Sequence, residues 1–372
     1  MHYLDANASE PPRPEARAAL LRALDVTGNP SSVHGPGRTA RRWLEDAREA
    51  LARRFGGRPE DLIFTSGGTE ADALALHALG AGRRLIVSAV EHDAIRAVAG
   101  SGAASGRNVV MLRVDAAGVA DLGQLEALLR DCPPALVCLM LANNETGTIQ
   151  PIAAAAALCR HHGALLHVDA VQAAGRIDVD IAALGAHALA LSSHKLGGPT
   201  GAGALLLASD APPVAALIVG GGQERGRRGG TPPVAVIAGF AAAACAAPIS
   251  TELAVLRDAA ERAAVSCGAI VCGAGVERLP NTTSLGLPGV RADAQVIALD
   301  LAGIAVSAGA ACSSGKVASS HVLTAMGLGA LAGQAIRVSL PWNATRADVD
   351  AFISAYQRMA DRLRSTLVPH AA

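Results

Sequence analysis

Six short apolar runs alternate with helix-like segments through the middle of the chain. The runs are RLIVSAV (84–90), VVMLRV (109–114), ALVCLMLA (135–142), ALLHVDA (164–170), ALALSS (188–193) and GALLLA (203–208). Helical patterns occupy 69–80, 92–100, 121–131 and 152–162. Continuous apolar strands separated by helices are typical of a mostly parallel sheet that is covered on both faces. The alternation therefore predicts an α/β fold.

Polar side chains stand at the carboxyl ends of four of these runs. In chain order they are His92, the pair Asn143 and Asn144, Asp169, and the pair His194 and Lys195. In open α/β sheets, ligands bind beyond the carboxyl ends of the strands. We therefore expect these residues to meet at one rim of the sheet and to form a site.

The balance of charges excludes a general attraction to polyanions. The chain has 32 Lys and Arg residues and 32 Asp and Glu residues, so no net field favours nucleic acid or an acidic membrane surface. The start, MHYLDANASE, lacks the basic and apolar regions of a signal peptide. The most apolar window, 234–247, is shorter than a membrane span and predicts a packed helix. We expect a cytoplasmic protein with no membrane segment and no direct nucleic-acid partner.

The cysteines indicate neither a disulfide framework nor a metal site. There are seven of them, at 132, 138, 159, 245, 267, 272 and 312. Their odd number and irregular spacing argue against paired disulfides, and no CxxC or zinc-like Cys/His spacing occurs. Most lie in apolar surroundings, where a cysteine is ordinarily a small core residue. Cys312 differs, because SAGAACSSGK surrounds it with the small residues of a loop.

The pattern changes after about residue 250. The segment 251–265 reads as a helix, 282–290 and 303–312 as short strands or loops, and 346–367 as a long final helix. A chain of 372 residues, 51% of them hydrophobic, is long enough for two domains. We predict a large domain over 13–250 and a smaller α/β domain formed by 1–12 and 251–372.

Three features of the predicted rim together indicate a pyridoxal phosphate site. TSGGTEAD (65–72) is a glycine-rich turn that opens a helix, where backbone N–H groups can hold an anion. Asp169 and Gln172 lie at a strand end, and Lys195 follows an apolar strand. Singly, each has an ordinary explanation: a helix start, a capping carboxylate, a lysine that reaches water. Together they supply a phosphate cradle, a partner for the pyridinium nitrogen and a Schiff-base amine.

The motifs along the chain resemble those of one enzyme family. YLDANAS, GNPSSVHGPGR, FTSGGTEAD, EHDAI, LANNETGTIQPI, HVDAVQAAGRI, SSHKLGGPTGAGAL, GGGQERGRRGGT, SAGAACSSG, SHVLTAMG and IRVSL occur in the order seen in cysteine desulfurases. These are the pyridoxal phosphate enzymes of the NifS/IscS type, with the fold of class V aminotransferases. The resemblance implies the PLP-dependent transferase fold (aspartate-aminotransferase-like), with a mostly parallel seven-stranded sheet in the large domain. The smaller α/β domain would carry the catalytic cysteine loop.

The resemblance also implies roles for the residues of the rim. Lys195 would form the Schiff base, and burial that lowers its pKa would help the amine to lose its proton. Asp169 would keep the ring nitrogen protonated, and His92 would lie over the ring as an acid or base. Gln172 would hydrogen-bond the ring hydroxyl. The phosphate would be held by Gly68, Thr69, Ser192 and His194, and by Thr231 of the neighbouring subunit in a homodimer.

The substrate implied by the resemblance is L-cysteine. Asn144 and Arg337 would grip its α-carboxylate, Arg337 by a two-pronged contact. The thiolate of Cys312, on a flexible loop, would attack the substrate sulfur. Alanine would leave, and a persulfide would remain on Cys312 for transfer to an acceptor protein such as an iron–sulfur scaffold.

Three positions depart from the expected pattern without removing a group that the chemistry needs. Ala73 stands where asparagine is frequent, Ser9 where threonine is common, and prolines follow Thr231. Two alternatives remain open. One is selenocysteine lyase, which uses the same cofactor and similar residues. The other is a cofactor-binding assembly subunit with little turnover, although the reactive residues are all present. An ordinary class V aminotransferase would have no use for the Cys312 loop.

Overall fold

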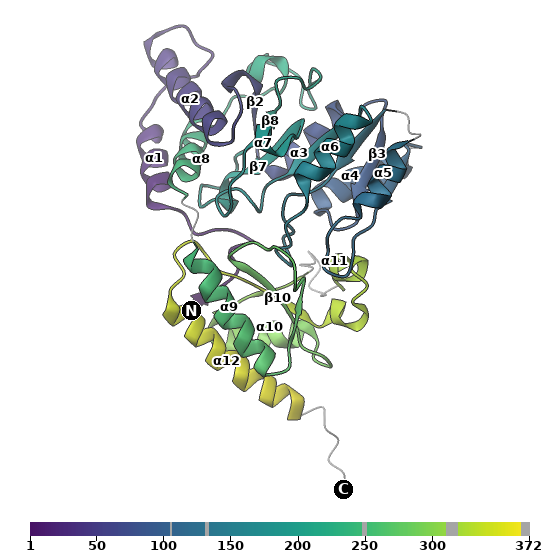
Figure 1. Ribbon diagram of the computed structural model, residues 1–372. Coiled ribbons are helices and arrows are strands. Elements are labelled where there is room, and N and C mark those ends of the chain that lie inside the picture. Colours follow the sequence, from purple (N-terminus) through teal and green to yellow (C-terminus); the bar gives the residue numbers. More distant parts are fainter. Residues whose placement is uncertain (105, 131–133, 248–250, 310–318, 366–372) are drawn as a thin grey trace.

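The computed structural model describes residues 1–104, 106–130, 134–247, 251–309 and 319–365 (Figure 1). Its α-helices are α1 (Pro14–Leu24), α2 (Gly35–Arg54), α3 (Gly68–Ala78), α4 (Asp93–Ala104), α5 (Leu122–Arg130), α6 (Ile152–His161), α7 (Ile181–Leu184), α8 (Val234–Ala246), α9 (Glu252–Ser266), α10 (Ala292–Leu301), α11 (His321–Ala325) and α12 (Arg346–Ser365). Its strands are β1 (His2–Tyr3), β2 (Leu62–Thr65), β3 (Arg84–Ser88), β4 (Val109–Leu112), β5 (Ala135–Cys138), β6 (Leu165–Asp169), β7 (Ala188–Ser192), β8 (Gly203–Leu207), β9 (Ile270–Cys272), β10 (Thr282–Gly286), β11 (Ile304–Ala305), β12 (Ser307–Ala308) and β13 (Ala335–Ser339). Short 3₁₀ turns lie at η1 (Pro59–Asp61), η2 (Ser193–Lys195), η3 (Gln223–Gly226) and η4 (Gly329–Gly333).

Seven strands form the large sheet in the order β2-β8-β7-β6-β5-β3-β4. The five from β7 to β4 are parallel, and β8 pairs antiparallel with both β7 and β2. The prediction of a mostly parallel sheet is therefore confirmed. All six runs read from the sequence are strands. The seventh, β2, was missed because its four residues, LIFT, form too short an apolar run to stand out.

Helices cover both faces of this sheet, as the strand pattern predicts (Figure 1). Along β5, Val137 belongs to one core cluster and its neighbours Leu136 and Cys138 to another, because successive side chains of a strand point to opposite faces. The first cluster takes its helical members from α1, α2, α5, α6, α7 and α8, and the second from α3 and α4. The sheet is thus buried on both sides, and its carboxyl edge is left for polar residues.

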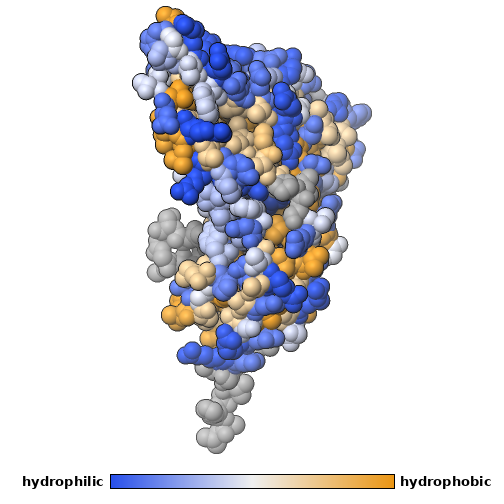
Figure 2. Space-filling view, turned by 90° about the vertical axis from the view of Figure 1, so that its left-hand side faces the viewer, coloured by the Kyte–Doolittle hydropathy of each residue, from blue (hydrophilic) through white to orange (hydrophobic). Residues whose placement is uncertain are grey.

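The apolar window at 234–247 is a packed helix, as predicted. It forms α8, in which Ile237 and Phe240 are fully buried. Among the described residues, no helix combines the length and the apolar character that crossing a bilayer requires. On the face that carries α1 and α2, hydrophilic residues are interspersed with apolar ones (Figure 2).

A second group of elements packs around its own apolar cluster below the large sheet (Figure 1). It contains the four-stranded antiparallel sheet β12-β13-β10-β9 and helices α9, α10 and α12. The first residues of the chain join it, since β1 pairs with β11 and Leu4 belongs to this cluster. The two-domain division at 12/13 and 250/251 is compatible with this packing and stays a prediction.

The N-terminal segment after β1 runs along the junction between the two groups. Asn7 donates from Nδ2 to the carbonyl of Asn144 (3.1 Å) on one side and to Thr282 Oγ1 (3.0 Å) on the other. Arg13 donates from Nε to the carbonyl of Leu196 (2.8 Å), directly after η2. The start of the chain thereby contacts Asn144, which lines the site described next, and Leu196, which follows the lining residue Lys195.

Candidate functional site

A cavity of about 260 Å³ lies at the carboxyl ends of the large sheet's strands. Nine of the predicted residues line it: Gly68, Thr69, His92, Asn144, Asp169, Gln172, Ser192, His194 and Lys195. They come from the segments that follow β2, β3, β5, β6 and β7. The strand ends therefore meet at one rim, as the sequence predicts.

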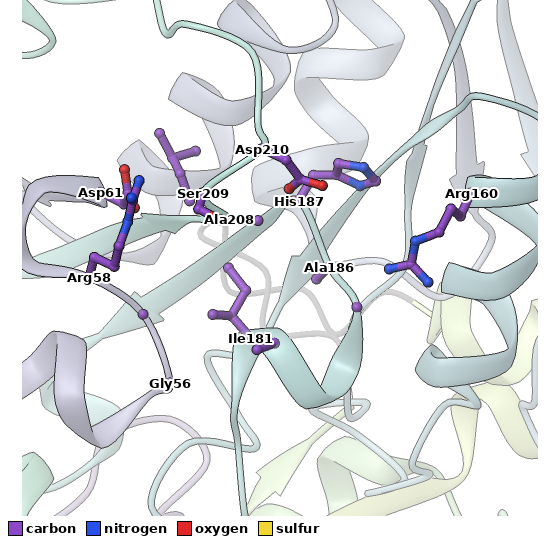
Figure 3. A pocket seen from close by; sticks show the side chains of 14 residues that line it. Gly56, Arg58, Asp61, Arg160, Ile181, Ala186, His187, Ala208, Ser209 and Asp210 are labelled. Atoms are coloured by element: carbon purple, nitrogen blue, oxygen red, sulfur yellow. The ribbon is translucent and has the colours of Figure 1, made fainter.

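A second cavity, of about 280 Å³, opens at the opposite edge of the sheet. Figure 3 shows Arg58 and Asp61 on one side of it, Arg160 on the other, and His187 and Asp210 between them. None of the predicted site residues lines this cavity. The Nδ1 atom of His187 accepts a hydrogen bond from the backbone N–H of Leu166 (3.0 Å).

Lys195 ends the turn η2, and its amine is held at the base of the first cavity. Nζ donates to the backbone carbonyls of Asn7 (2.5 Å) and Ala8 (3.0 Å). Burial lowers the pKa of Lys195 to about 8, and the charges of Arg337 and Arg176 act in the same direction. At pH 7.5 about a quarter of such amines are neutral, against about a thousandth at the ordinary value.

Asp169 ends β6 and lies opposite the lysine. Its Oδ1 accepts from the backbone N–H of Val171 (2.8 Å), and its side chain is almost fully buried. Burial raises the pKa of Asp169, while the backbone hydrogen bond and the charges of His92 and Lys195 oppose that rise. The carboxylate needs a cation in the cavity, and a protonated ring nitrogen is such a cation.

His92 is oriented by the first turn of α4. Its Nδ1 accepts from the backbone N–H of Ala94 (3.1 Å), so a neutral ring carries its proton on Nε2. The side chain lines the cavity together with Asp169 and Lys195. This ring is therefore placed to give or take a proton inside the cavity.

The amino end of α3 forms one wall of the cavity and is tightly packed. A Cβ atom at Gly68 would lie 2.6 Å from Cγ2 of Val171, so the backbone approaches this wall without a side chain. Behind the turn, a Cβ atom at Gly203 would lie 2.7 Å from Cα of Gly67. Backbone N–H groups at a helix start favour an anion. Glycine at these positions thus lets the backbone of the turn pack closely, and the N–H groups of that backbone are the part that could hold a phosphate.

His194 and Gln172 are fixed by neighbours within the protein. Nδ1 of His194 lies 3.2 Å from Ser9 Oγ, and burial lowers the pKa of His194 to about 4, which leaves the ring neutral. Gln172 donates from Nε2 to the carbonyl of Asn7 (3.0 Å), and its Oε1 accepts from Arg176 (2.7 Å). One N–H of the Gln172 amide remains for a ligand, since Nε2 carries two hydrogens.

Arg337, on β13, lies beside the cavity and pairs with a residue that the sequence did not single out. It donates from Nη2 to Oδ1 of Asp5 (2.7 Å) and from Nη1 to the carbonyl of Asn144 (3.2 Å). Two buried atoms here, Arg337 Nε and Asn144 Oδ1, have no hydrogen-bond partner within the described ranges. Buried polar atoms are rarely left unpaired, so this pair points to a missing ligand.

Thr231 does not line the cavity. Thr231 lines a separate hollow of about 220 Å³ with Phe64, Glu224 and Arg228. The loop that carries it is tied down by two ion pairs, Arg228 with Glu70 (2.8 Å) and Glu224 with Arg48 (2.7 Å). Cys312 lies outside the described residues, so its predicted role stays a prediction.

The sequence reasoning did not identify three further lining residues, Asp72, Met140 and Val171. Asp72 pairs with His167 (2.9 Å) beneath the cavity, and both side chains are buried. Burial raises the pKa of Asp72 well above its usual range and lowers that of His167 to about 4. Both residues stand inside quoted motifs, TSGGTEAD and HVDAVQ. The presence of an ionisable residue in each of these two motifs was the available signal.

Comparisons with known proteins agree with this geometry. The class-V aminotransferase family model matches residues 2–352. An IscS-like cysteine desulfurase of Mycobacterium tuberculosis is 39% identical over 98% of this chain and 97% of its own. A cysteine desulfurase of Cereibacter sphaeroides is 41% identical over 98% of this chain and 96% of its own.

A solved structure shows the same fold. The X-ray structure of a NifS-like protein from Rickettsia africae has a TM-score of 0.90 and 34% sequence identity, and the match covers 97% of this chain and 99% of that one. The likeness therefore extends over both groups of elements and over the cavity between strand ends and N-terminal segment. Sequence, fold and site together show that the chain belongs to the NifS/IscS-type cysteine desulfurases of the class V aminotransferase family.

Proposed function

We propose that the cavity binds pyridoxal 5′-phosphate and that the enzyme uses it to move the sulfur of L-cysteine onto Cys312. The observation that supports this most directly is the buried amine of Lys195, with its pKa lowered to about 8, in the same cavity as the carboxylate of Asp169. An amine that is partly uncharged near pH 7 can add to an aldehyde, and a buried carboxylate can pair with a pyridinium nitrogen. The unpaired Asn144 Oδ1 and the open start of α3 supply further places for polar groups of the ligand.

Each wall of the cavity would hold a different part of the cofactor. Lys195 would bind the aldehyde carbon covalently, and Asp169 would pair with the ring nitrogen. Gly68, Thr69, Ser192 and His194 would hold the phosphate, with His194 as a neutral hydrogen-bonding group because its pKa is low. The free N–H of Gln172 would donate to the ring hydroxyl. When bound, the cofactor would withdraw electrons from the carbon skeleton of the substrate.

The protein's own groups would move the protons. Once the amino group of the substrate has replaced Nζ at the aldehyde carbon, the freed Nζ of Lys195 would take the proton from the α-carbon of the substrate, because its lowered pKa leaves it a base near neutrality. Nε2 of His92 would exchange a proton on the open side of the cavity. Asp169 would stay ionised beside the protonated ring nitrogen of the cofactor. It would thereby keep that nitrogen protonated, which is the form in which the ring withdraws electrons.

Arg337 and Asn144 would grip the substrate carboxylate. Nε of Arg337 has no partner among the described residues, and Nη2 is bound to Asp5. A two-pronged contact through these two nitrogens would require the substrate carboxylate to displace Asp5. Substrate binding would therefore exchange one ion pair for another.

The reaction balances without an added oxidant or reductant. A bond would form between the Cys312 thiolate and the substrate sulfur as the bond from this sulfur to the β-carbon breaks. The β-carbon would keep the electron pair and gain a proton, which gives L-alanine. The sulfur would remain as a persulfide on Cys312. It would then pass to an acceptor thiol, for example on an iron–sulfur scaffold protein.

A homodimer forms part of the proposal. Thr231 lies outside the cavity of its own chain, in a loop held by the Glu70–Arg228 pair. Such a residue is free to contact the phosphate in a neighbouring subunit. A cytoplasmic location remains a prediction from the sequence.

The decisive experiment separates cofactor binding from sulfur transfer. Cys312→Ser should keep the colour of the bound cofactor and bind L-cysteine, but should form neither alanine nor sulfide, because the accepting thiolate is missing. Cys245→Ser, which removes an exposed cysteine of α8, is the matched control and should turn over normally. Full sulfide release by Cys312→Ser would refute the proposed role. Comparing selenide with sulfide release from the two amino acids would separate this function from selenocysteine lyase.

A further inference from the structure

The turn over residues 143–147 connects three parts of the molecule that the proposed reaction needs. Asn143 closes the turn, since its Oδ1 accepts from the backbone N–H groups of Glu145 (2.9 Å) and Thr146 (3.0 Å). From Nδ2 it donates to the carbonyl of Val90 (3.0 Å), next to the segment that carries His92. The carbonyl of Asn144 accepts from Arg337. The mechanism uses Asn144 but neither of its neighbours, Asn143 and Glu145.

Glu145 reaches from this turn to both flanks of the segment that contains Cys312. On the carboxyl flank, Ser320 donates from Oγ to Oε2 of Glu145 (2.5 Å). On the amino flank, a Cβ atom at Gly309 would overlap the same Oε2 atom. That Cβ atom would also lie 3.3 Å from Cβ of Ser320, so the two flanks meet at this carboxyl group.

Both flanks are also fixed to the elements around the site. Ser307 and Ala308, in β12, pair with Arg337 and Ile336 of β13. On the other flank, Ser320 caps α11 by accepting from the backbone N–H of Leu323 (3.0 Å). The next residue, His321, lies with Nε2 3.0 Å from the carbonyl of Glu91, beside His92. The flanks are therefore anchored on the strand of Arg337 and on the segment of His92.

A hydrogen bond from one serine stabilises a solvent-exposed carboxylate only slightly. Glu145, however, is 2% exposed, so its hydrogen bond with Ser320 matters more. Burial raises the pKa of Glu145, and the hydrogen bond from Ser320 and the charge of Arg337 oppose this rise. A buried acidic group restrains both flanks in different ways: moving Ser320 would leave the carboxyl group without this hydrogen bond, and moving Gly309 would break its close packing against the same group.

We infer that Glu145 is a positioning residue for sulfur transfer: its carboxyl joins Gly309 to Ser320 and sets where the thiol of Cys312 meets the substrate held by Arg337. This inference rests on the proposed role of Cys312. Glu145 touches neither substrate nor cofactor. It acts on the distance between thiol and sulfur, on which the rate of such a transfer depends steeply.

The test compares three substitutions in the cofactor-loaded full chain. Glu145→Ala should slow alanine formation in a single turnover by about tenfold or more, with an unchanged KM for L-cysteine and an unchanged spectrum on cysteine binding. Glu145→Gln should restore most of the rate, because its amide oxygen still accepts from Ser320. Glu261→Ala is the matched control: it removes a carboxylate of α9 that pairs with Arg278 (2.6 Å) and that, in the part of the chain that the structure describes, forms no hydrogen bond with Gly309 or Ser320. It should leave the rate unchanged.

A double-mutant cycle adds a readout that a general loss of stability would not reproduce. Gly309→Ala should be harmful in the native chain, because the methyl group meets Oε2 of Glu145. In the Glu145→Ala background the same change should cost less than about threefold, since the space is then free. Additive effects of the two substitutions would overturn the inference, as would a Glu145→Ala enzyme with native rate.

Hydrogen exchange in the cofactor-free protein separates this inference from the proposed function. The backbone N–H of Leu323, which Ser320 caps, should exchange faster in Glu145→Ala than in the native chain or in Glu261→Ala. Unchanged exchange would contradict the restraint. If Cys312→Ser still released sulfide, the proposed function would fail, whereas exchange and the double-mutant cycle would still decide whether Glu145 restrains the two flanks.

Discussion

The two cavities at opposite edges of the large sheet are similar in volume but differ in how deeply their charged side chains are buried. At the carboxyl edge, Asp169 is 5% exposed, and burial lowers the pKa of Lys195 to about 8. At the amino edge, the side chain of Arg58 is 53% exposed and pairs with Asp61 at 2.6 Å (Figure 3). An arginine that reaches water in this way gains little from its ion pair. The comparison teaches that enclosure of charged groups, rather than cavity size, distinguishes the reactive site.

The sharpest contrast between the cavities should come from removing one cation from each. Lys195→Ala should reduce alanine formation to below about a thousandth of the native rate, because Lys195 is the only lysine among the described residues that line the cavity. The absorbance of the protein-bound aldehyde should disappear as well. Arg160→Ala, in the other cavity, should change neither quantity. Comparable losses from the two substitutions would break the distinction.

A milder change should separate the two cavities by substrate affinity. Arg337→Lys keeps the charge but loses the fork that grips a carboxylate through two nitrogens, so KM for L-cysteine should rise by about ten- to a hundredfold. The value of kcat should change less. Arg58→Lys should leave both constants at their native values. An unchanged KM in Arg337→Lys would mean that the carboxylate binds elsewhere.

The pH dependence of cofactor binding should reveal the enclosed amine directly. Only the neutral amine adds to an aldehyde, so the rate of cofactor binding to the cofactor-free protein should rise by about tenfold per pH unit below pH 8. Above this pH it should level off, because the pKa of Lys195 is about 8. Stopped-flow absorbance between pH 6 and 10 measures the profile. A midpoint near the ordinary value, 10.5, would contradict the enclosure.

The smallest expected effect concerns Glu91, which is buried beneath the carboxyl-edge cavity and accepts from the backbone N–H of Met140 (2.7 Å). Burial raises its pKa from 4.5 to about 8. Between these values the folded state keeps a proton that the unfolded state has released, so the contribution of Glu91 to stability falls as pH rises through this window.

Glu91→Gln should therefore raise the melting temperature at pH 9 by about 5 °C and leave it unchanged at pH 4. Calorimetry of the cofactor-free protein measures both values. Asp61→Asn, at the exposed edge, should show no such pH-dependent gain. A gain that is equal at both pH values would show that Glu91 does not hold its proton in the folded state.

The sequence predicted the rim well because strand ends are local features. Asp169, Ser192 and Lys195 follow apolar runs, and parallel strands bring such ends together whatever the order of the strands. The missed groups are contacts between distant parts of the chain. Asp5 and Arg337 are 332 positions apart, and Ser320 and Glu145 are 175 apart. Spacing in the sequence carries no information on such pairs.

Burial was the other quantity that the sequence did not supply. The TSGGTEAD motif contains Asp72 and Thr69 alike, but only the fold shows that Asp72 lies with His167 beneath the cavity. The strand β2 was missed for a related reason. Its four residues pair only with the antiparallel strand β8, and they are fixed by that partner rather than by their own pattern.

The antiparallel strand β8 places Gly203, which has no reactive group, directly behind the anion-binding turn. Gly203 opens this strand and lies against the backbone of Gly67, with no space for a methyl group between them. A larger residue there would push the turn toward the ligand from behind. Substitutions at position 203 would therefore lower the activity as substitutions of a catalytic residue do. Gly203 contributes no chemical group to the reaction; it only leaves space for the backbone of Gly67.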